Sequence, residues 1–276
     1  YAGPPRQAAA VLKAITTFKP TVFVSVPTIY SAILSLPNFY KRYDIRSLRM
    51  CISAGEPLPL QTWNTWRDTT EIEILDTIGC TETYHTFMAN RPGEVRPGSS
   101  GKPIRGYDVR LVDDEGKDVQ AGVVGNLMVR GESTALFYLH QSEKTRHSFR
   151  GEWLFTGDQY LQDKDGYYWH KGRVDDMLKV GGLWVSPMEI EEVLSGHDSV
   201  ADCAVVGHYD NAGLLKPKAF VCLRNGVEPS DELFEQLVKL CAKTLDAHKR
   251  PRWLEFNNDL PRTSTGKLQR FKLREQ

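Results

Sequence analysis

The stretch "GRVDDMLKVGGLWVSPMEIEEVL", residues 172–194, decides the fold because it has the features of a junction between two domains. A Gly-Gly pair is usually just a hairpin turn and adjacent aspartates a solvated link. Here they occur together with an arginine and a lysine, directly before a predicted helix. Ser186 is expected to cap that helix, with Pro187 in its first position and Glu189 in its third, the spacing of a capping box.

The residues before this junction predict two kinds of structure. Up to about residue 106, helical stretches alternate with short apolar strands, as in α/β proteins with parallel strands. The helices are expected over 4–18 and 58–68 and the strands over 21–26, 48–53 and 72–75, with the first strand buried. From about residue 107, short strands separated by Asp-Gly and Glu-Gly turns indicate antiparallel β structure.

The residues after the junction predict a small α+β domain. Two strands, a helix over 231–245 and a last short strand follow one another. Ser230 is expected to cap the helix, and its apolar residues share one face: Leu233, Phe234, Leu237, Val238, Cys241 and Leu245. We therefore predict an α/β and α+β chain with domains at 1–174 and 175–276.

Composition excludes several classes of protein. The 276 residues carry 35 basic and 35 acidic side chains, which argues against nucleic-acid binding. No apolar run approaches the roughly 20 residues that a membrane span needs. Five cysteines without a CxxC pair favour a reducing, cytoplasmic compartment over a disulfide framework or a zinc site. The chain starts at Tyr1 without a signal-peptide pattern, so we expect it to be part of a longer polypeptide.

Three polar segments carry candidate chemistry. "DTIGCTET", residues 76–83, follows a strand; Gly79 permits close backbone approach, and Thr81 and Glu82 are placed where open α/β sheets bind ligands. Alone, this segment fits a polar loop with a solvated Glu82 better than a ligand site. Asp158 ends the segment "TGD", a common turn. The third segment, "PRTSTGKLQR", residues 261–270, places a lysine in a loop without an apolar pattern. "DKDGYY", residues 163–168, is predicted to be a turn and not a calcium loop.

Taken in order, six segments resemble the adenylate-forming superfamily of acyl-CoA synthetases, luciferases and peptide-synthetase adenylation domains. The similarity is closest to the benzoate-type aryl-CoA ligases, which also have isoleucine before the glycine of the second segment. The segments are "SAGEPLP", "DTIGCTE", "GNLMVRG", "WLFTGD", the junction of residues 172–194 and "PRTSTGKLQR". The resemblance implies the end of a large domain, an α/β sheet plus a small β-barrel, followed by a small mobile domain.

The resemblance also implies a nucleotide site and its chemistry. ATP and a carboxylic acid would form an acyl-adenylate, from which coenzyme A then displaces AMP. Thr81 would contact the α-phosphate and Glu82 would hold Mg²⁺, a cation that prefers oxygen ligands. The other nucleotide-binding residues implied are Gly55, Glu56 and Pro57 beside the adenine, Asp76 near its amino group, Gly79, Asp158 on the ribose hydroxyls and Arg173 assisting it.

Four further residues receive roles from the resemblance. Lys267 would bridge the attacking carboxylate and the α-phosphate, which stabilises the transition state electrostatically. Asp175 would be the hinge of the small domain, and Gly182 would line the pantetheine tunnel after that domain rotates. His85, just beyond Glu82, is a candidate for the acyl pocket.

The sequence leaves several matters open. The family's glycine-rich phosphate loop would belong upstream of Tyr1, so we expect the other half of the enzyme there and poor adenylation by this chain alone. Benzoate, hydroxybenzoates and aminobenzoates are not distinguished, and neither the oligomeric state nor the residues that bind the coenzyme A adenosine are identified. The alternatives are another acyl-CoA synthetase, a carrier-loading adenylation domain, or a non-catalytic nucleotide-binding module.

Overall fold

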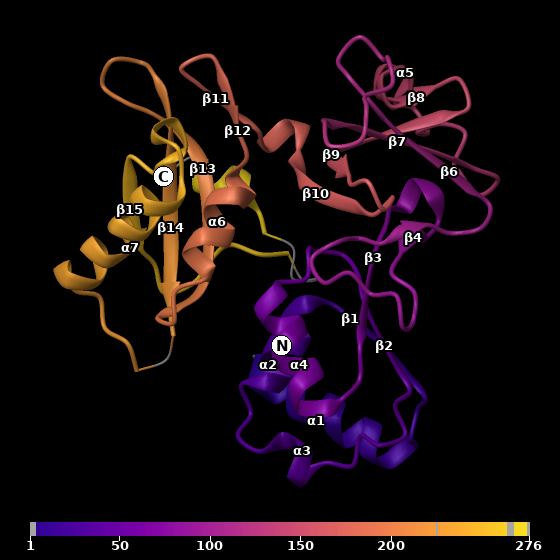
Figure 1. Cartoon of the computed structure of the whole chain (residues 1–276), viewed down its shortest axis with the longest axis vertical. Coiled ribbons are helices and arrows are strands. Elements are labelled where there is room, and N and C mark those ends of the chain that lie inside the picture. Colours follow the sequence, from indigo (N-terminus) through magenta and orange to yellow (C-terminus); the bar gives the residue numbers. More distant parts are fainter. Residues whose placement is uncertain (1–3, 225, 264–267, 275–276) are drawn as a thin grey trace. The chain divides into compact units, whose positions relative to one another are not determined.

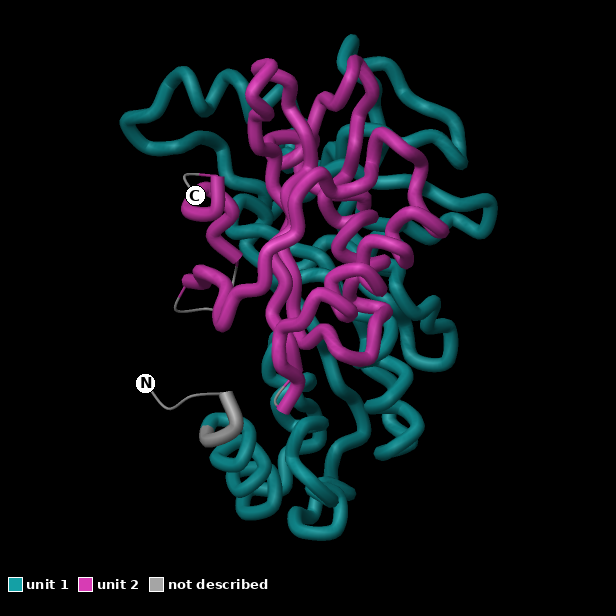
Figure 2. Tube along the Cα trace, turned by 90° about the vertical axis from the view of Figure 1, so that its left-hand side faces the viewer, with its two compact units in different colours: residues 1–170 teal, residues 171–276 magenta. Residues whose placement is uncertain are grey.

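The chain forms two compact units, Tyr1–His170 and Lys171–Gln276, coloured separately in Figure 2. The structure is a computed structural model that describes residues 4–224, 226–263 and 268–274. Lys267 lies outside the described residues. None of the helices in the described part combines the length and the apolar character that crossing a membrane requires.

A five-stranded mixed sheet of order β1-β2-β3-β4-β5 opens the first unit (Figure 1). The first three strands are parallel, as predicted, and β4 and β5 are antiparallel additions. The strands are β1 Val22–Ser25, β2 Met50–Ser53, β3 Ile74–Gly79, β4 Thr86–Ala89 and β5 Lys102–Pro103. The helices before and between them are α1 Pro4–Phe18, α2 Pro27–Leu34, α3 Phe39–Arg42 and α4 Leu60–Thr70, and a 3₁₀ turn, η1 Thr81–Thr83, follows β3.

Aromatic side chains from the helices fix the strands of this sheet. Trp66 of α4 and Tyr30 of α2 are fully buried and contact each other edge to face, with ring centroids 5.0 Å apart. The Tyr30 hydroxyl donates to the Ile52 carbonyl at 2.9 Å, and Trp63 Nε1 donates to the Ile74 carbonyl at 2.9 Å. These bonds satisfy buried polar groups and hold β2 and β3 against the helices.

The expectation of a buried strand over 21–26 was wrong in one respect. Val24, in the middle of β1, is 62 % exposed. The reason is that β1 ends the order of the described strands and pairs with β2 alone, so the helices cover it incompletely.

A second, antiparallel sheet follows in the first unit, and the chain passes from the first unit to the second within its last strand, after His170. Its order is β10-β9-β7-β6, with β8 paired to β9. The elements are β6 Tyr107–Val112, β7 Val124–Gly131, α5 Ser142–Ser148, β8 Phe149–Arg150, β9 Trp153–Gln162 and β10 Tyr168–Arg173. Phe87 and Met88 of β4 pack into its core with Leu127 and Leu154, which joins the two sheets. Asp163 forms the predicted turn by accepting hydrogen bonds from two backbone N–H groups.

The second unit is a three-stranded sheet covered on both faces by helices. Strands β13 and β14 are antiparallel, and β15 is parallel to β14. Alternate residues of β13 face opposite sides: Val205 packs with α6 and α7, and Val206 packs with α8. The elements are η2 Val174–Asp176, the hairpin β11 Leu178–Val180 and β12 Leu183–Val185, α6 Pro187–Ser195, β13 Val200–Tyr209, β14 Leu215–Leu223, α7 Asp231–Thr244, η3 Ala247–Lys249, β15 Trp253–Phe256 and α8 Arg270–Arg274.

Two details of the predicted helices differ from expectation. Ser186 precedes α6 but does not cap it through its side chain; its hydroxyl donates to the Lys171 carbonyl at 2.5 Å. Glu189 instead pairs with Lys249 at 2.7 Å. In α7 the Ser230 hydroxyl caps the Leu233 N–H as predicted. Phe234 and Val238 are partly exposed, because the buried stripe is narrower than the apolar face of the sequence.

Candidate active site

The carboxyl ends of β2 and β3 bring several predicted residues together. These strands are parallel and paired in register, Ser53 opposite Asp76, so the loop after β2 lies beside the end of β3. Gly55 has φ +94°, which favours glycine, and turns the chain there. Glu56 is half-buried and accepts a long hydrogen bond from Thr28, whereas Gly55 and Pro57 are exposed.

Asp76 is a buried carboxylate with an unused acceptor. Its side chain is within β3, and its Oδ1 atom has no hydrogen-bond partner among the described residues. Burial raises the pKa of Asp76 well above its usual value, although the backbone N–H groups of Thr77 and Leu58 act in the opposite direction. A buried acceptor of this kind is costly unless it receives a donor. The amino group of an adenine would be such a donor.

Glu82, in contrast, is kept ionised. Burial acts to raise its pKa, but the hydrogen bond from Tyr138 and the charge of Lys144 help to lower it overall. The Tyr138 hydroxyl donates to Glu82 Oε1 at 2.7 Å. Burial and this bond raise the pKa of Tyr138 to about 12, so the phenol stays protonated and keeps donating. An ionised, half-buried carboxylate is a suitable ligand for Mg²⁺.

Gly79 is required by the fold of this hairpin. A Cβ at Gly79 would overlap the carbonyl group of His85 and would lie 2.7 Å from the Cα of Thr86. The close approach observed is therefore to the neighbouring backbone, and the contact of Gly79 with a nucleotide stays a prediction. Thr81 and His85 are both exposed beside it. Their side chains are accessible to a ligand, and their roles also stay predictions.

Asp158 comes to the same region from the antiparallel sheet. Its carboxylate is 3.5 Å from Nε2 of His170, and both side chains are 16 % exposed. Beside them, burial raises the pKa of Tyr160, and the charges of Asp158 and Asp76 add to that effect. Tyr160 thus lies within electrostatic reach of both predicted nucleotide-binding carboxylates. Its hydroxyl lies 3.0 Å from Ser100 Oγ.

Three residues of this region were missed by sequence reasoning: Tyr138, Tyr160 and His170. Tyr138 is 56 positions from Glu82, and it belongs to no segment that the sequence analysis singled out. His170 follows an alternating strand pattern and has a buried Nδ1 atom without a partner in the described chain. Only the pairing of β9 with β10 could have indicated that His170 faces Asp158.

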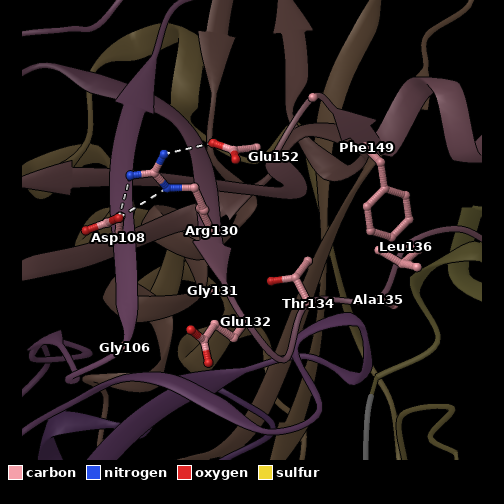
Figure 3. Close-up of a pocket in the computed structure, with 11 residues that line it drawn as sticks. Gly106, Asp108, Arg130, Gly131, Glu132, Thr134, Ala135, Leu136, Phe149 and Glu152 are labelled. Atoms are coloured by element: carbon pink, nitrogen blue, oxygen red, sulfur yellow. Dashed lines mark hydrogen bonds and ion pairs between the residues drawn. The ribbon is translucent and has the colours of Figure 1, made fainter.

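A cavity of about 490 Å³ lies beside this region, over β6, β7 and the segment after β7 (Figure 3). Arg130 lies at its edge, with Asp108 at 2.7 Å and Glu152 at 3.0 Å. The two carboxylates balance the charge of the guanidinium, which makes the cavity a poor site for an anion. The segment also contacts the Glu82 backbone, because the Ala135 N–H donates to the Glu82 carbonyl at 2.7 Å.

The second unit carries the remaining predicted residues. Arg173 and Asp175 are exposed at the start of this unit. Gly181 and Gly182 form the two-residue turn between β11 and β12, with φ +57° and +87°, as the Gly-Gly pair predicted. A Cβ at either glycine would meet nothing within 4 Å. No cluster of three His, Cys, Asp or Glu side chains suited to a metal occurs among the described residues of the chain.

The chain belongs to the AMP-binding enzyme family. The family model matches residues 1–139, and the model of the AMP-binding enzyme C-terminal domain matches residues 189–267. The resemblance seen in the sequence is therefore confirmed, and so is the mixed α/β architecture.

Several relatives are named as aryl-CoA ligases, and others as acyl-coenzyme A synthetases. The benzoate–CoA ligase of Thauera aromatica is 46 % identical over 96 % of this chain and 50 % of its own length. The 4-hydroxybenzoate–CoA/benzoate–CoA ligase of Rhodopseudomonas palustris is 44 % identical over 96 % of this chain and 50 % of its own length. A crystal structure of an anthranilate–CoA ligase with anthranoyl-AMP has a TM-score of 0.92 and 53 % identity, over 100 % of this chain and 53 % of that one. The chain thus spans about half the length of the curated relatives that it matches.

Proposed function

We propose that the polypeptide containing this chain is an ATP-dependent aryl-CoA ligase that acts on benzoate or a substituted benzoate. One observation carries the proposal: two carboxylates, one within β3 and one in the turn that follows it, have opposite properties. Asp76 is a buried acceptor in need of a donor, and Glu82 is held ionised by Tyr138. Such a divergence is typical of sites in which neighbouring carboxyl groups have different tasks. Membership of the AMP-binding enzyme family and the similarity to aryl-CoA ligases support the same proposed function.

In this proposal the first half-reaction joins the acid to AMP. A carboxylate oxygen of the substrate attacks the α-phosphorus of ATP, the bond to the β-phosphate oxygen breaks, and pyrophosphate leaves. Asp76 accepts a hydrogen bond from the adenine amino group, with Gly55, Glu56 and Pro57 beside the ring. Asp158, assisted by Arg173, holds the ribose hydroxyls, and its neighbour His170 orients it.

The phosphates are held by the exposed end of the β3 hairpin. Thr81 contacts the α-phosphate and Glu82 is the ligand for Mg²⁺. When bound, the cation would neutralise phosphate charge. Lys267 adds a second positive charge at the reacting centre, and removal of one such preorganised contact typically costs about 10²–10³ in rate.

In the second half-reaction the coenzyme A thiol attacks the acyl carbon, and the bond from that carbon to the AMP oxygen breaks. The thiol loses its proton to solvent. Rotation of the second unit about Asp175 would withdraw Lys267 and bring Gly182 to the pantetheine arm, so that one site performs two reactions in turn. The exposed, neighbour-free turn at Gly182 fits close passage of a thiol chain. A reducing, cytoplasmic compartment accords with the five free cysteines and remains a prediction.

The test is thioester formation by the natural polypeptide that contains this chain. It would receive ATP, Mg²⁺, coenzyme A and a panel of benzoate, hydroxybenzoates, aminobenzoates and fatty acids. Strong preference for one aryl acid is expected and would identify the substrate. Preference for fatty acids would indicate another acyl-CoA synthetase. Adenylation with transfer to a carrier protein alone would indicate a carrier-loading enzyme, and nucleotide binding without either step a non-catalytic module.

A further inference from the structure

A cluster of four charged side chains connects η2, which contains the predicted hinge residue Asp175, to the C-terminal helix α8 of the second unit. Arg274 of α8 donates to Asp176 Oδ1 at 2.6 Å and to the Asp175 carbonyl at 3.3 Å. Arg270, one turn earlier on α8, is 3.7 Å from Asp176 Oδ2. Its other contact is with Glu191 of α6 at 2.8 Å. Two arginines of one short helix therefore converge on one aspartate beside the predicted hinge.

This cluster is better placed to fix geometry than a surface ion pair. The side chains of Arg270 and Glu191 are 16 % and 15 % exposed, that of Asp176 is 26 % exposed, and that of Arg274, at the edge of the cluster, is 39 % exposed. Glu191 also accepts the Val205 N–H of β13 at 2.7 Å. A partly buried pair with additional hydrogen bonds is less screened by solvent than the exposed pairs that contribute little. The cluster thus links η2, α6, α8 and the sheet.

The same helix begins at Arg270, three positions after Lys267, and the described residues on both sides of the segment that contains Lys267 are held together. Arg262 and Leu268 form an antiparallel β-bridge, and the Gln269 N–H donates to the Pro261 carbonyl at 2.8 Å. Arg262 is paired with Asp202 of β13 at 2.6 Å. Leu268 packs against the core beneath α8. The described residues that flank the segment containing Lys267, 261–262 and 268–270, are therefore joined to each other and to the sheet.

We infer that Asp176, with Arg270 and Arg274, is a positioning group that makes η2 and the described residues flanking Lys267, 261–262 and 268–270, move as one body. The inference rests on the proposed function, because it assigns Lys267 to the first half-reaction. If Asp176 is held to α8, the backbone rotation that turns the second unit must occur at residues before Asp176. Without the cluster, α8 and the described residues that flank Lys267 could shift relative to η2. Displacement of a catalytic group by about 1 Å can cost about 10² in rate.

The test separates the two half-reactions in the natural polypeptide containing this chain. ATP–pyrophosphate exchange with benzoate measures adenylation, and supplied benzoyl-adenylate with coenzyme A measures thioester formation. Asp176→Asn and Arg274→Gln are each expected to slow adenylation by roughly tenfold to a hundredfold and thioester formation by less than about threefold. The double variant should be little slower than the worse single variant, because both substitutions disrupt the same Asp176–Arg274 pair.

A matched control comes from an ordinary surface pair in the same unit. Lys239 and Glu235 of α7 form a largely exposed ion pair at 3.0 Å. Lys239→Gln removes this ion pair without changing the cluster. It should leave both half-reactions unchanged. Equal loss of both half-reactions in Asp176→Asn would indicate a merely structural role and overturn the inference, as would additive effects in the double variant or an unchanged adenylation rate.

Two further measurements keep this inference separate from the proposed function. Lys267→Ala is run in parallel: if it leaves adenylation intact, the proposed role of Lys267 fails, whatever the cluster does. Hydrogen exchange of backbone amides in α8 needs no turnover at all. Faster exchange over residues 270–274 in Asp176→Asn, with the rest of the unit unchanged, is expected, and unchanged exchange there would show that Asp176 does not hold α8.

Discussion

Asp76 and Glu82 show how environment sets the properties of one functional group. Asp76 lies within β3 and Glu82 in the turn after it. Burial raises the pKa of Asp76, whereas the pKa of Glu82 is lowered, since its hydrogen-bond donors and a nearby lysine outweigh burial. The sequence assigns both to the nucleotide site through the resemblance. It contains no signal for the difference, which depends on Tyr138 from a distant segment and on the helices that cover β3.

The raised pKa of Asp76 predicts a stability effect with a definite sign. The folded state favours the neutral acid, so this carboxyl costs stability as pH rises from its unfolded pKa, about 4, toward the folded value. Asp76→Asn should therefore raise the melting temperature at pH 7, and its advantage should shrink as pH falls toward 4. Thermal unfolding across this pH range, without nucleotide, checks it. Asp68→Asn, an exposed change, should show neither effect.

Substitution of Gly79 is expected to lower the stability of the fold more directly than it affects the reaction. In Gly79→Ala the new methyl group would meet the backbone of His85 and Thr86, which cannot move aside like a flexible side chain. We expect a loss of about 1–3 kcal/mol in the free energy of unfolding, measured by urea denaturation. Thr81→Ala, on an exposed neighbour, should leave stability unchanged while slowing adenylation. If Gly79→Ala were as stable as the parent, the close packing of this hairpin would be refuted.

At the scale of elements, the β11–β12 hairpin offers a comparison of two adjacent glycines. Both have positive φ and open space around the Cβ position, so Gly181→Ala and Gly182→Ala should strain the turn by similar amounts, about 1 kcal/mol each. The proposed role in thiol passage belongs to Gly182 alone. Thioester formation from supplied adenylate should therefore fall much further in Gly182→Ala, and adenylation should change little in either variant. Equal effects would argue against a pantetheine contact at Gly182.

Elements were predictable from the sequence where local pattern and burial agree. The parallel strands β1–β3, the antiparallel strands after residue 107 and the Ser230 cap of α7 all followed from apolar runs, turn residues and capping chemistry. The failures involve distant partners. Ser186 was expected to cap its own helix, but the Lys171 carbonyl, fifteen positions earlier, takes its hydroxyl. His170 could not be placed beside Asp158 without the strand pairing.

At the scale of the whole molecule, the chain matches only about half the length of its curated relatives, which predicts low activity of the chain by itself. The chain covers about half of each curated relative, and the segment that would supply a glycine-rich phosphate loop is not within it. We expect this 276-residue chain by itself to show less than about a hundredth of the pyrophosphate exchange of the natural polypeptide containing it. Full exchange by a purified chain of verified mass would contradict this and would place all phosphate contacts within these residues.

The glycine turn between β11 and β12 has one more consequence, which concerns light rather than chemistry. It is followed by Trp184, 58 % exposed, whereas Trp63 and Trp66 are buried under the first sheet. An indole in water emits at longer wavelength than a buried one, so Trp184 contributes the red edge of the tryptophan spectrum. If the hairpin enters a pocket during the second half-reaction, that edge should shift to the blue. The polypeptide containing this chain would then carry its own fluorescent signal for the proposed alternation, without any attached dye.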